Sequence, residues 1–158
     1  MIVVSDTTPI HYLILIGKEF ILPELFTEII IPDVVVSEMS HPKAPQRVQG
    51  WIANLPAWAA TCAGSEKLMQ TISGLGKGET AAIAIAIERK VDAVLMDDRR
   101  AIREASKNGV TTLTTFALLE LASLNQLIDF EEAIDDLAKT NFHFPPDQIV
   151  KEYLRRVR

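Results

Sequence analysis

Residues 2–9 read IVVSDTTP, a short apolar run that ends at Asp6 and passes directly into residues typical of a helix start. The run does not alternate apolar with polar residues, which is the pattern of a strand buried on both faces of a parallel sheet. A second continuous apolar run, 93–96, ends in the same way at Asp97 and Asp98. The two runs predict central strands of one sheet, each followed by acidic residues.

Alternating strands and helices extend this pattern along the chain. Periodicity and turn residues predict further strands over residues 28–31, 58–62 and 110–113, and helices over 10–17, 23–26, 46–54, 79–89, 99–107, 116–125, 131–139 and from 147 onward. Asp33 is expected to be the N-cap of another helix, and residues 40–56 are expected to form a surface excursion. The order predicts an α/β fold, a three-layer α/β/α sandwich with a central, mostly parallel sheet.

Length and composition favour a single domain over residues 1–158, with residues 140–158 as a C-terminal helical tail. The chain is 48% hydrophobic, which is enough to bury one core. No apolar run approaches the roughly 20 residues that span a bilayer, and the N-terminus has no basic leader, so we expect a soluble, cytoplasmic protein. Cys62 is the only cysteine, which excludes an intramolecular disulfide. The net charge of −5 argues against a protein that coats nucleic acid non-specifically.

Four acidic positions are expected to meet at one edge of this sheet. Asp6 and the pair Asp97-Asp98 follow strands, Glu79 lies in the first turn of a helix, and Glu38 lies about one turn into another. Ligands bind open parallel sheets beyond the carboxyl ends of the strands. Carboxylates gathered there repel one another, and a hard cation such as Mg²⁺ or Mn²⁺ removes that conflict. The sequence therefore predicts a metal site built from carboxylates.

Each acid taken alone has a simpler explanation, as a turn residue, an N-cap or a solvent-facing helix residue. Only the joint pattern favours a site. The glycine-rich stretch 74–79 lacks the Lys-Ser/Thr ending of a phosphate-binding Walker loop, and it is expected to let the backbone turn into a buried helix. His11, His41 and His143 lack the spacing of metal ligands, so they are expected to be surface or packing residues.

Four stretches of the chain are similar to the PIN-domain ribonucleases, and more narrowly to a PIN-like group often encoded as toxins beside small antitoxins. The stretches read VSDTTPI (4–10), IPDVVVSE (31–38), GKGETAAI (76–83) and VLMDDRRA (94–101). Each is weak alone, but together their order and spacing are fairly specific. The resemblance implies an α/β/α domain whose acids bind Mg²⁺ or Mn²⁺ and hydrolyse RNA. One departure lies at residues 113–115, where relatives commonly have a glycine before the threonine.

The resemblance also assigns expected roles to single residues. It implies that Asp6 and Asp98 are direct metal ligands and that Glu38 and Glu79 hold a second ion or metal-bound waters. Asp97 joins these four in the predicted catalytic set, and the choice between Asp97 and Asp98 stays open. Lys77, Arg99 and Arg100 are expected to position the RNA backbone. Thr7 is placed with them among the substrate-binding residues, or is expected to hydrogen-bond an acidic ligand or a metal-bound water.

The implied function is a metal-dependent endoribonuclease, the toxin of a type II toxin-antitoxin system, with RNA as substrate and a small antitoxin as partner. A homodimer is expected from the apolar helix 116–127 and from the family's habit. The alternative is an inactive PIN-like module that binds RNA or protein without cutting it. A phosphoacceptor receiver domain is disfavoured because no lysine follows the strand at 110–113, and a haloacid-type phosphatase because Thr8 replaces its second aspartate.

Overall fold

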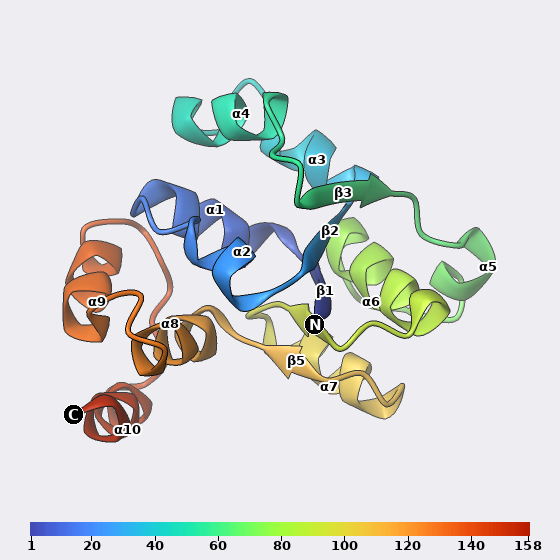
Figure 1. The fold of residues 1–158 in the computed structure, drawn as a ribbon. Helices are drawn as coiled ribbons and strands as arrows, with labels where there is room; N and C mark the ends of the chain where they lie inside the picture. The colour runs from blue at the N-terminus through green and yellow to red at the C-terminus, as the bar shows by residue number, and fades with distance from the viewer.

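The computed structural model describes residues 1–158 and has a five-stranded sheet at its centre (Figure 1). The strands are β1 (Ile2–Ser5), β2 (Glu28–Pro32), β3 (Ala59–Cys62), β4 (Ala93–Leu95) and β5 (Thr112–Leu113). Their order is β3-β2-β1-β4-β5, and every neighbouring pair is parallel. The predicted sheet is confirmed, and β1 and β4 are neighbours within it.

Ten helices connect and cover the strands. They are α1 (Thr7–Leu15), α2 (Ile21–Leu25), α3 (Asp33–Met39), α4 (Gln46–Ala53), α5 (Glu66–Met69), α6 (Lys77–Arg89), α7 (Arg99–Lys107), α8 (Thr115–Leu124), α9 (Phe130–Ala138) and α10 (Asp147–Val157). No helix has both the length and the apolar composition needed to cross a membrane.

Side chains of the central strands alternate between two hydrophobic cores. Val3 of β1 packs in the core formed with α1, α2, α8 and α9, whereas Val4 packs in the core formed with α6 and α7. Ile29 and Ile30 of β2 divide in the same way. Both faces of the sheet are therefore covered by helices, which confirms the three-layer sandwich. It also explains why these strands are apolar without alternation.

Helix α6 is the most deeply buried helix of the fold. Residues 81–86 are all buried, as its apolar composition on every side predicts. The helix packs against β1, β2 and β4. Its N-terminus is thereby held in a fixed position relative to the central strands, and this positions Glu79.

Two boundary predictions were wrong. Helix α1 begins at Thr7 rather than near Ile10, because Asp6 is its N-cap and Pro9 fits the first turn, where its missing N–H costs no hydrogen bond. Pro32, not Asp33, precedes α3 in the extended conformation of an N-cap, and Asp33 is the first helical residue. There its charge is favourable beside the positive end of the helix dipole.

The segment expected to be a surface excursion contributes to the core. Helix α4 places Val48 and Ile52 in the same core as α1 and α3, so only part of residues 40–56 lies at the surface. The short helix α5 had not been expected. At the C-terminus, α10 packs on α8 and α9 through the half-buried residues Val150, Tyr153 and Leu154.

Candidate functional site

The carboxyl edge of the sheet brings the acids of β1 and β4 beside each other. Ser5 pairs with Leu95 in the parallel register, and the Asp6 N–H donates a hydrogen bond of 2.9 Å to the Leu95 carbonyl. Asp6 and the Asp97-Asp98 pair therefore leave neighbouring strands at the same edge. Glu79 reaches this edge from the first turn of α6, and Glu38 from the last turn of α3.

Gly78 lies where two of these carboxylates approach the backbone of α6. A Cβ atom on Gly78 would lie 3.0 Å from Asp6 Oδ1 and 3.3 Å from Glu38 Oε1. The Val35 side chain closes the third side, with Cγ2 at 3.2 Å. The two carboxylate oxygens thus converge on one point, and only a glycine leaves that point open.

Asp6 is the acid whose charge is least favoured by its surroundings. It is only 6% exposed, and burial is the main reason that its pKa rises to about 7. The hydrogen bond from the Thr7 backbone lowers the pKa, whereas Glu79, Glu38 and Asp97 raise it further by repulsion. A cation near these oxygens would stabilise the ionised form.

Glu79 experiences the same repulsion from another side of the cluster. Burial raises its pKa most, and the negative charges of Asp98 and Glu38 add to the rise. The Gly76 N–H donates to Glu79 Oε2 at 3.2 Å, and this bond and the Arg100 guanidinium lower the pKa. Each predicted acid therefore lies within the electrostatic range of at least one other.

Asp97 and Asp98 have different surroundings. Both oxygens of Asp97 accept hydrogen bonds from Thr115, Oδ1 from the backbone N–H at 2.8 Å and Oδ2 from the hydroxyl at 2.6 Å. Burial raises the pKa of Asp97, and these two bonds lower it. Asp98 is exposed, and its Oδ1 caps α7 by accepting from the Ala101 N–H at 3.0 Å. Asp97 is the fixed, inner carboxylate and Asp98 the outer one.

Thr115 is a residue of the site that the sequence analysis did not predict. It is fully buried and begins α8, directly after β5, the strand beside β4. The rule that functional groups follow parallel strands at their carboxyl ends would have included it. The missing glycine at residues 113–115 indicated an altered turn, but it did not predict that the Thr115 hydroxyl binds Asp97.

The residues predicted to contact substrate fall into two groups. Thr7 donates its hydroxyl hydrogen bond to Glu38 Oε2, so it orients an acid of the site. Lys77, Arg99 and Arg100 are exposed at the starts of α6 and α7. None of the structure's ion pairs includes these three cations, so they are available to an anion.

The donor set fits a cation that keeps part of its water shell. No three side chains among Asp, Glu, His and Cys converge closely enough to form a complete metal cage. Mg²⁺ is commonly held by one or two carboxylates with waters and substrate oxygens in its other positions. Asp6 and Glu38 beside Gly78 offer such a pair, with oxygen donors that suit Mg²⁺ or Mn²⁺.

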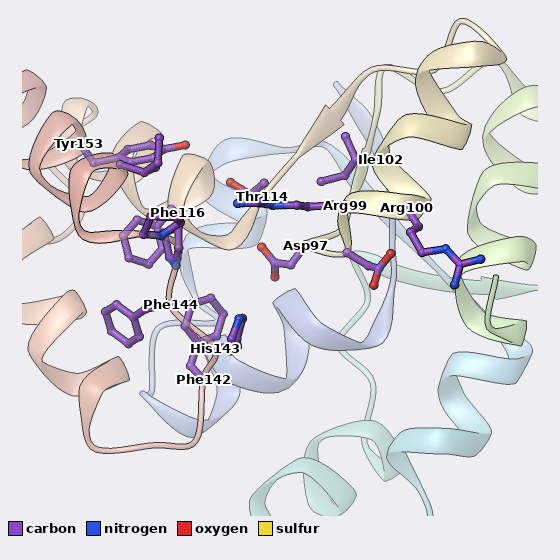
Figure 2. Close-up of a pocket in the computed structure, with 14 residues that line it drawn as sticks. Asp97, Arg99, Arg100, Ile102, Thr114, Phe116, Phe142, His143, Phe144 and Tyr153 are labelled. Carbon is purple, nitrogen blue, oxygen red and sulfur yellow. The ribbon is translucent and has the colours of Figure 1, made fainter. Parts of the chain in front are cut away.

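Two cavities flank the acids. One, of about 770 Å³, is lined by Asp97, Asp98 and several aromatic residues. Figure 2 shows the aromatic side chains on one side of Asp97 and Arg100 on the other. The second cavity, of about 530 Å³, is lined by Thr7 and Glu38 among others. Each cavity is therefore lined by at least one of the acids, Asp97 and Asp98 in the first and Glu38 in the second.

Comparison with known proteins agrees with this architecture. No curated protein matches the sequence significantly. A solved structure, the PilT N-terminus domain protein SSO1118 from the hyperthermophilic archaeon Sulfolobus solfataricus, is similar with a TM-score of 0.52 and 16% sequence identity. The similarity covers 92% of this chain and 100% of that one, and at this identity it concerns the fold.

The family model DUF3368, described as a PIN domain, matches residues 2–158. This range includes every strand of the sheet and all the acids at its carboxyl edge. The chain therefore belongs to the PIN-domain family, whose members are generally nucleases.

Proposed function

We propose that this protein is an endoribonuclease that depends on Mg²⁺ or Mn²⁺. The observation that carries the proposal is the approach of the Asp6 and Glu38 carboxylates to one point beside Gly78, with Glu79 and Asp97 close enough to raise the pKa of Asp6. Such a cluster of carboxylates is unfavourable without a cation. Membership of a nuclease family gives a reason for the cluster, because a bound cation would take part in phosphodiester hydrolysis.

Carboxylates at the end of β1, in α3 and α6, and at the start of α7 would surround the metal ion. Asp6 and Glu38 would hold the ion, with Glu79 and Asp98 next to it, and Thr7 keeps Glu38 oriented. When bound, the ion supplies a water of lowered pKa and stabilises negative charge on the phosphate.

The cationic residues act on the substrate. Arg99, Arg100 and Lys77 would bind the phosphates on either side of the one that is cut, because they lie at the starts of α7 and α6 and form no ion pair within the chain. Thr115 holds the Asp97 carboxylate in place through its two hydrogen bonds.

The test is to incubate the purified protein with a mixed pool of RNA in Mn²⁺ and in EDTA and to identify the product ends. We expect cleavage only with the metal, and no 2′,3′-cyclic phosphate, because the attacking group is water rather than the RNA's own 2′-hydroxyl. Cleavage in EDTA, or cyclic phosphate ends, would contradict the proposal. Binding of RNA without cleavage in either buffer would favour the inactive binding module.

A toxin role is part of the same proposal and rests on the similarity to the PIN-like group. RNA hydrolysis by an unrestrained enzyme would stop bacterial growth, and a small antitoxin would block the carboxyl edge. Induced expression is expected to arrest growth, whereas the Asp6→Asn variant is not. Normal growth with active enzyme present would argue against a toxin.

A homodimer is also proposed, although several apolar residues of the helix that predicted it are buried within the chain. Phe116, Leu118 and Leu119 of the apolar helix are buried in the chain's own core. Leu124, at 60% exposure, is the apolar residue that this helix leaves at the surface. Light scattering at increasing concentration tests for the dimer, and a constant monomer mass would exclude it.

A further inference from the structure

The larger cavity beside the acids has an aromatic interior that the proposed chemistry does not use. Phe116 and Phe142 form its buried base, and Phe144 and Tyr153 are half-buried in its wall. The four residues come from α8, from the segment between α9 and α10, and from α10 itself. The C-terminal segment therefore folds back to complete a cavity next to the carboxyl edge (Figure 2).

The aromatic rings hold one another in place. Phe144 packs edge to face on Phe116 and on Phe142, with ring centroids 5.6 and 5.5 Å apart. Tyr153 packs in the same way on Phe116 at 5.4 Å. Such contacts fix the rings before any ligand arrives. Arg156 lies over the Tyr153 ring, 4.4 Å from its centroid, so the half-buried Phe144 is the ring that is left for a flat ligand to stack on, at no cost in ordering.

Charges at the rim of the cavity indicate what kind of flat ligand fits. Arg99 and Arg100 line it, and neither forms an ion pair with the rest of the chain. An aromatic interior next to free guanidinium groups suits a nucleotide, with its base on the rings and its phosphate at the arginines.

The position of the cavity connects it to the proposed reaction. Asp97 and Asp98 belong both to the cavity wall and to the acidic edge. A strand whose phosphate lies at the acids would therefore place a neighbouring base at the mouth of the cavity. The volume of about 770 Å³ is within the usual range for ligand sites and is ample for a base with its ribose.

We propose that this cavity binds an unpaired nucleobase of the RNA, next to the phosphate that is cut. The inference rests on the proposed ribonuclease function and adds a base-binding site to it. A base in a duplex is stacked on both faces and cannot enter, so the base that this cavity binds is an unpaired one.

The first test uses an RNA hexamer of adenosines that carries the fluorescent base 2-aminopurine at one position at a time. Binding of this hexamer to the protein is measured in Ca²⁺, and the RNA is checked afterwards to be intact. Stacking quenches 2-aminopurine, so we expect strong quenching at one position of the strand. Removing the base at that position is expected to weaken binding by about tenfold, the effect of one lost stacked base.

A pair of variants tests whether this cavity is the site. Ile149 lines the cavity at 37% exposure in the first turn of α10, where an acidic residue is compatible with the helix. Ile149→Asp is expected to abolish the position-specific quenching and to weaken binding of the hexamer about tenfold. Leu124→Asp makes the same change of charge on α8, outside the cavity, and is expected to bind like the parent. Thermal unfolding confirms that both variants are folded.

The outcomes separate this inference from the proposed function. RNA that is cleaved in Mn²⁺ while the hexamer binds equally with and without the base would overturn the base pocket and leave the ribonuclease intact. A protein that neither binds nor cleaves RNA would overturn both. Adenosine monophosphate binding as tightly as the hexamer would show a site for free nucleotides and would overturn the assignment to an RNA strand.

Discussion

Asp6 is the residue of the site whose negative charge is most disfavoured by its surroundings. It follows the central strand, is 6% exposed, and has a pKa of about 7 because burial and three neighbouring acids disfavour its charge. Its folded-state pKa lies above the ordinary value of 3.8, so the folded protein binds this proton more tightly than the unfolded chain does. The contribution of Asp6 to stability therefore falls as the pH rises from about 4 to about 7.

Asp6→Asn is accordingly expected to stabilise the metal-free protein at pH 7, by on the order of 3 kcal/mol, since it removes the charge and keeps an oxygen that can accept from Thr7. The advantage over the parent should disappear near pH 4, where Asp6 is protonated. Urea unfolding of both proteins in EDTA at the two pH values measures this. A variant less stable than the parent at pH 7 would contradict the buried-charge account.

Thr115 supports the neighbouring acid. Thr115→Val keeps the shape of the side chain but removes the hydroxyl that donates to Asp97 Oδ2. We expect a loss of about 1 to 3 kcal/mol in unfolding free energy and a further rise in the pKa of Asp97, because this bond lowers it. Thr115→Ser retains the donor and should leave the pKa near that of the parent. Carboxyl titration by NMR tells the two apart, and identical titration curves would disprove the role.

At the scale of elements, the start of α6 shapes the site. The helix is anchored by its buried face against β1, β2 and β4, and Gly78 in its first turn allows the Asp6 and Glu38 oxygens to approach. An ordinary side chain at this position would occupy the point on which both carboxylates converge. The glycine therefore serves the site as well as the turn.

Gly78→Ala and Gly50→Ala are a matched pair of helical substitutions. A Cβ on Gly50 of α4 meets nothing within 4 Å, so Gly50→Ala should stabilise the protein by about 0.5 to 1 kcal/mol through helix propensity. At Gly78 the same gain is opposed by contacts of 3.0 to 3.3 Å, and displacement of the carboxylates should weaken Mn²⁺ binding at least tenfold. Calorimetric titration with Mn²⁺ measures this effect. Equal Mn²⁺ affinity in the two variants would show that the approach to Gly78 is unimportant.

Elements whose burial is uniform were predictable from the sequence, and contacts between distant elements were not. The apolar runs of β1 and β4 and the apolar α6 gave the three layers, because burial on both faces leaves a direct signature in composition. The acids at strand ends followed from topology. The bond from Thr115 to Asp97, the closeness of Gly78 and the burial of Val48 depend on tertiary packing, which local periodicity does not encode. The start of α1 was missed because Pro9 is tolerated within a first turn.

At the scale of the molecule, the parallel sheet and the C-terminal segment together create one working edge. The strands place the acids, and the segment from residue 142 to α10 adds the aromatic cavity beside them. A ligand that binds only the folded protein raises its stability, by about 2.7 kcal/mol at 100 times the dissociation constant. Binding at this edge therefore has a measurable global effect.

Mn²⁺ is expected to raise the melting temperature of the parent protein and to have little effect on Asp6→Asn, because the variant lacks a central ligand of the site. Differential scanning calorimetry at matched ionic strength measures this, with Ca²⁺ as a second cation of the same charge. An equal rise in both proteins would place the bound ion elsewhere.

The rate of Mn²⁺-dependent cleavage of a mixed single-stranded RNA pool tests the central claim most directly when three proteins are compared. Asp135→Asn serves as the control, because Asp135 is an exposed acid of α9 that lines neither of the cavities beside the acidic edge. The account predicts that this variant cuts like the parent, while Asp6→Asn loses about 100-fold or more in rate and remains folded. Cleavage by Asp6→Asn at the parental rate would contradict the assignment of the acidic edge as the active site.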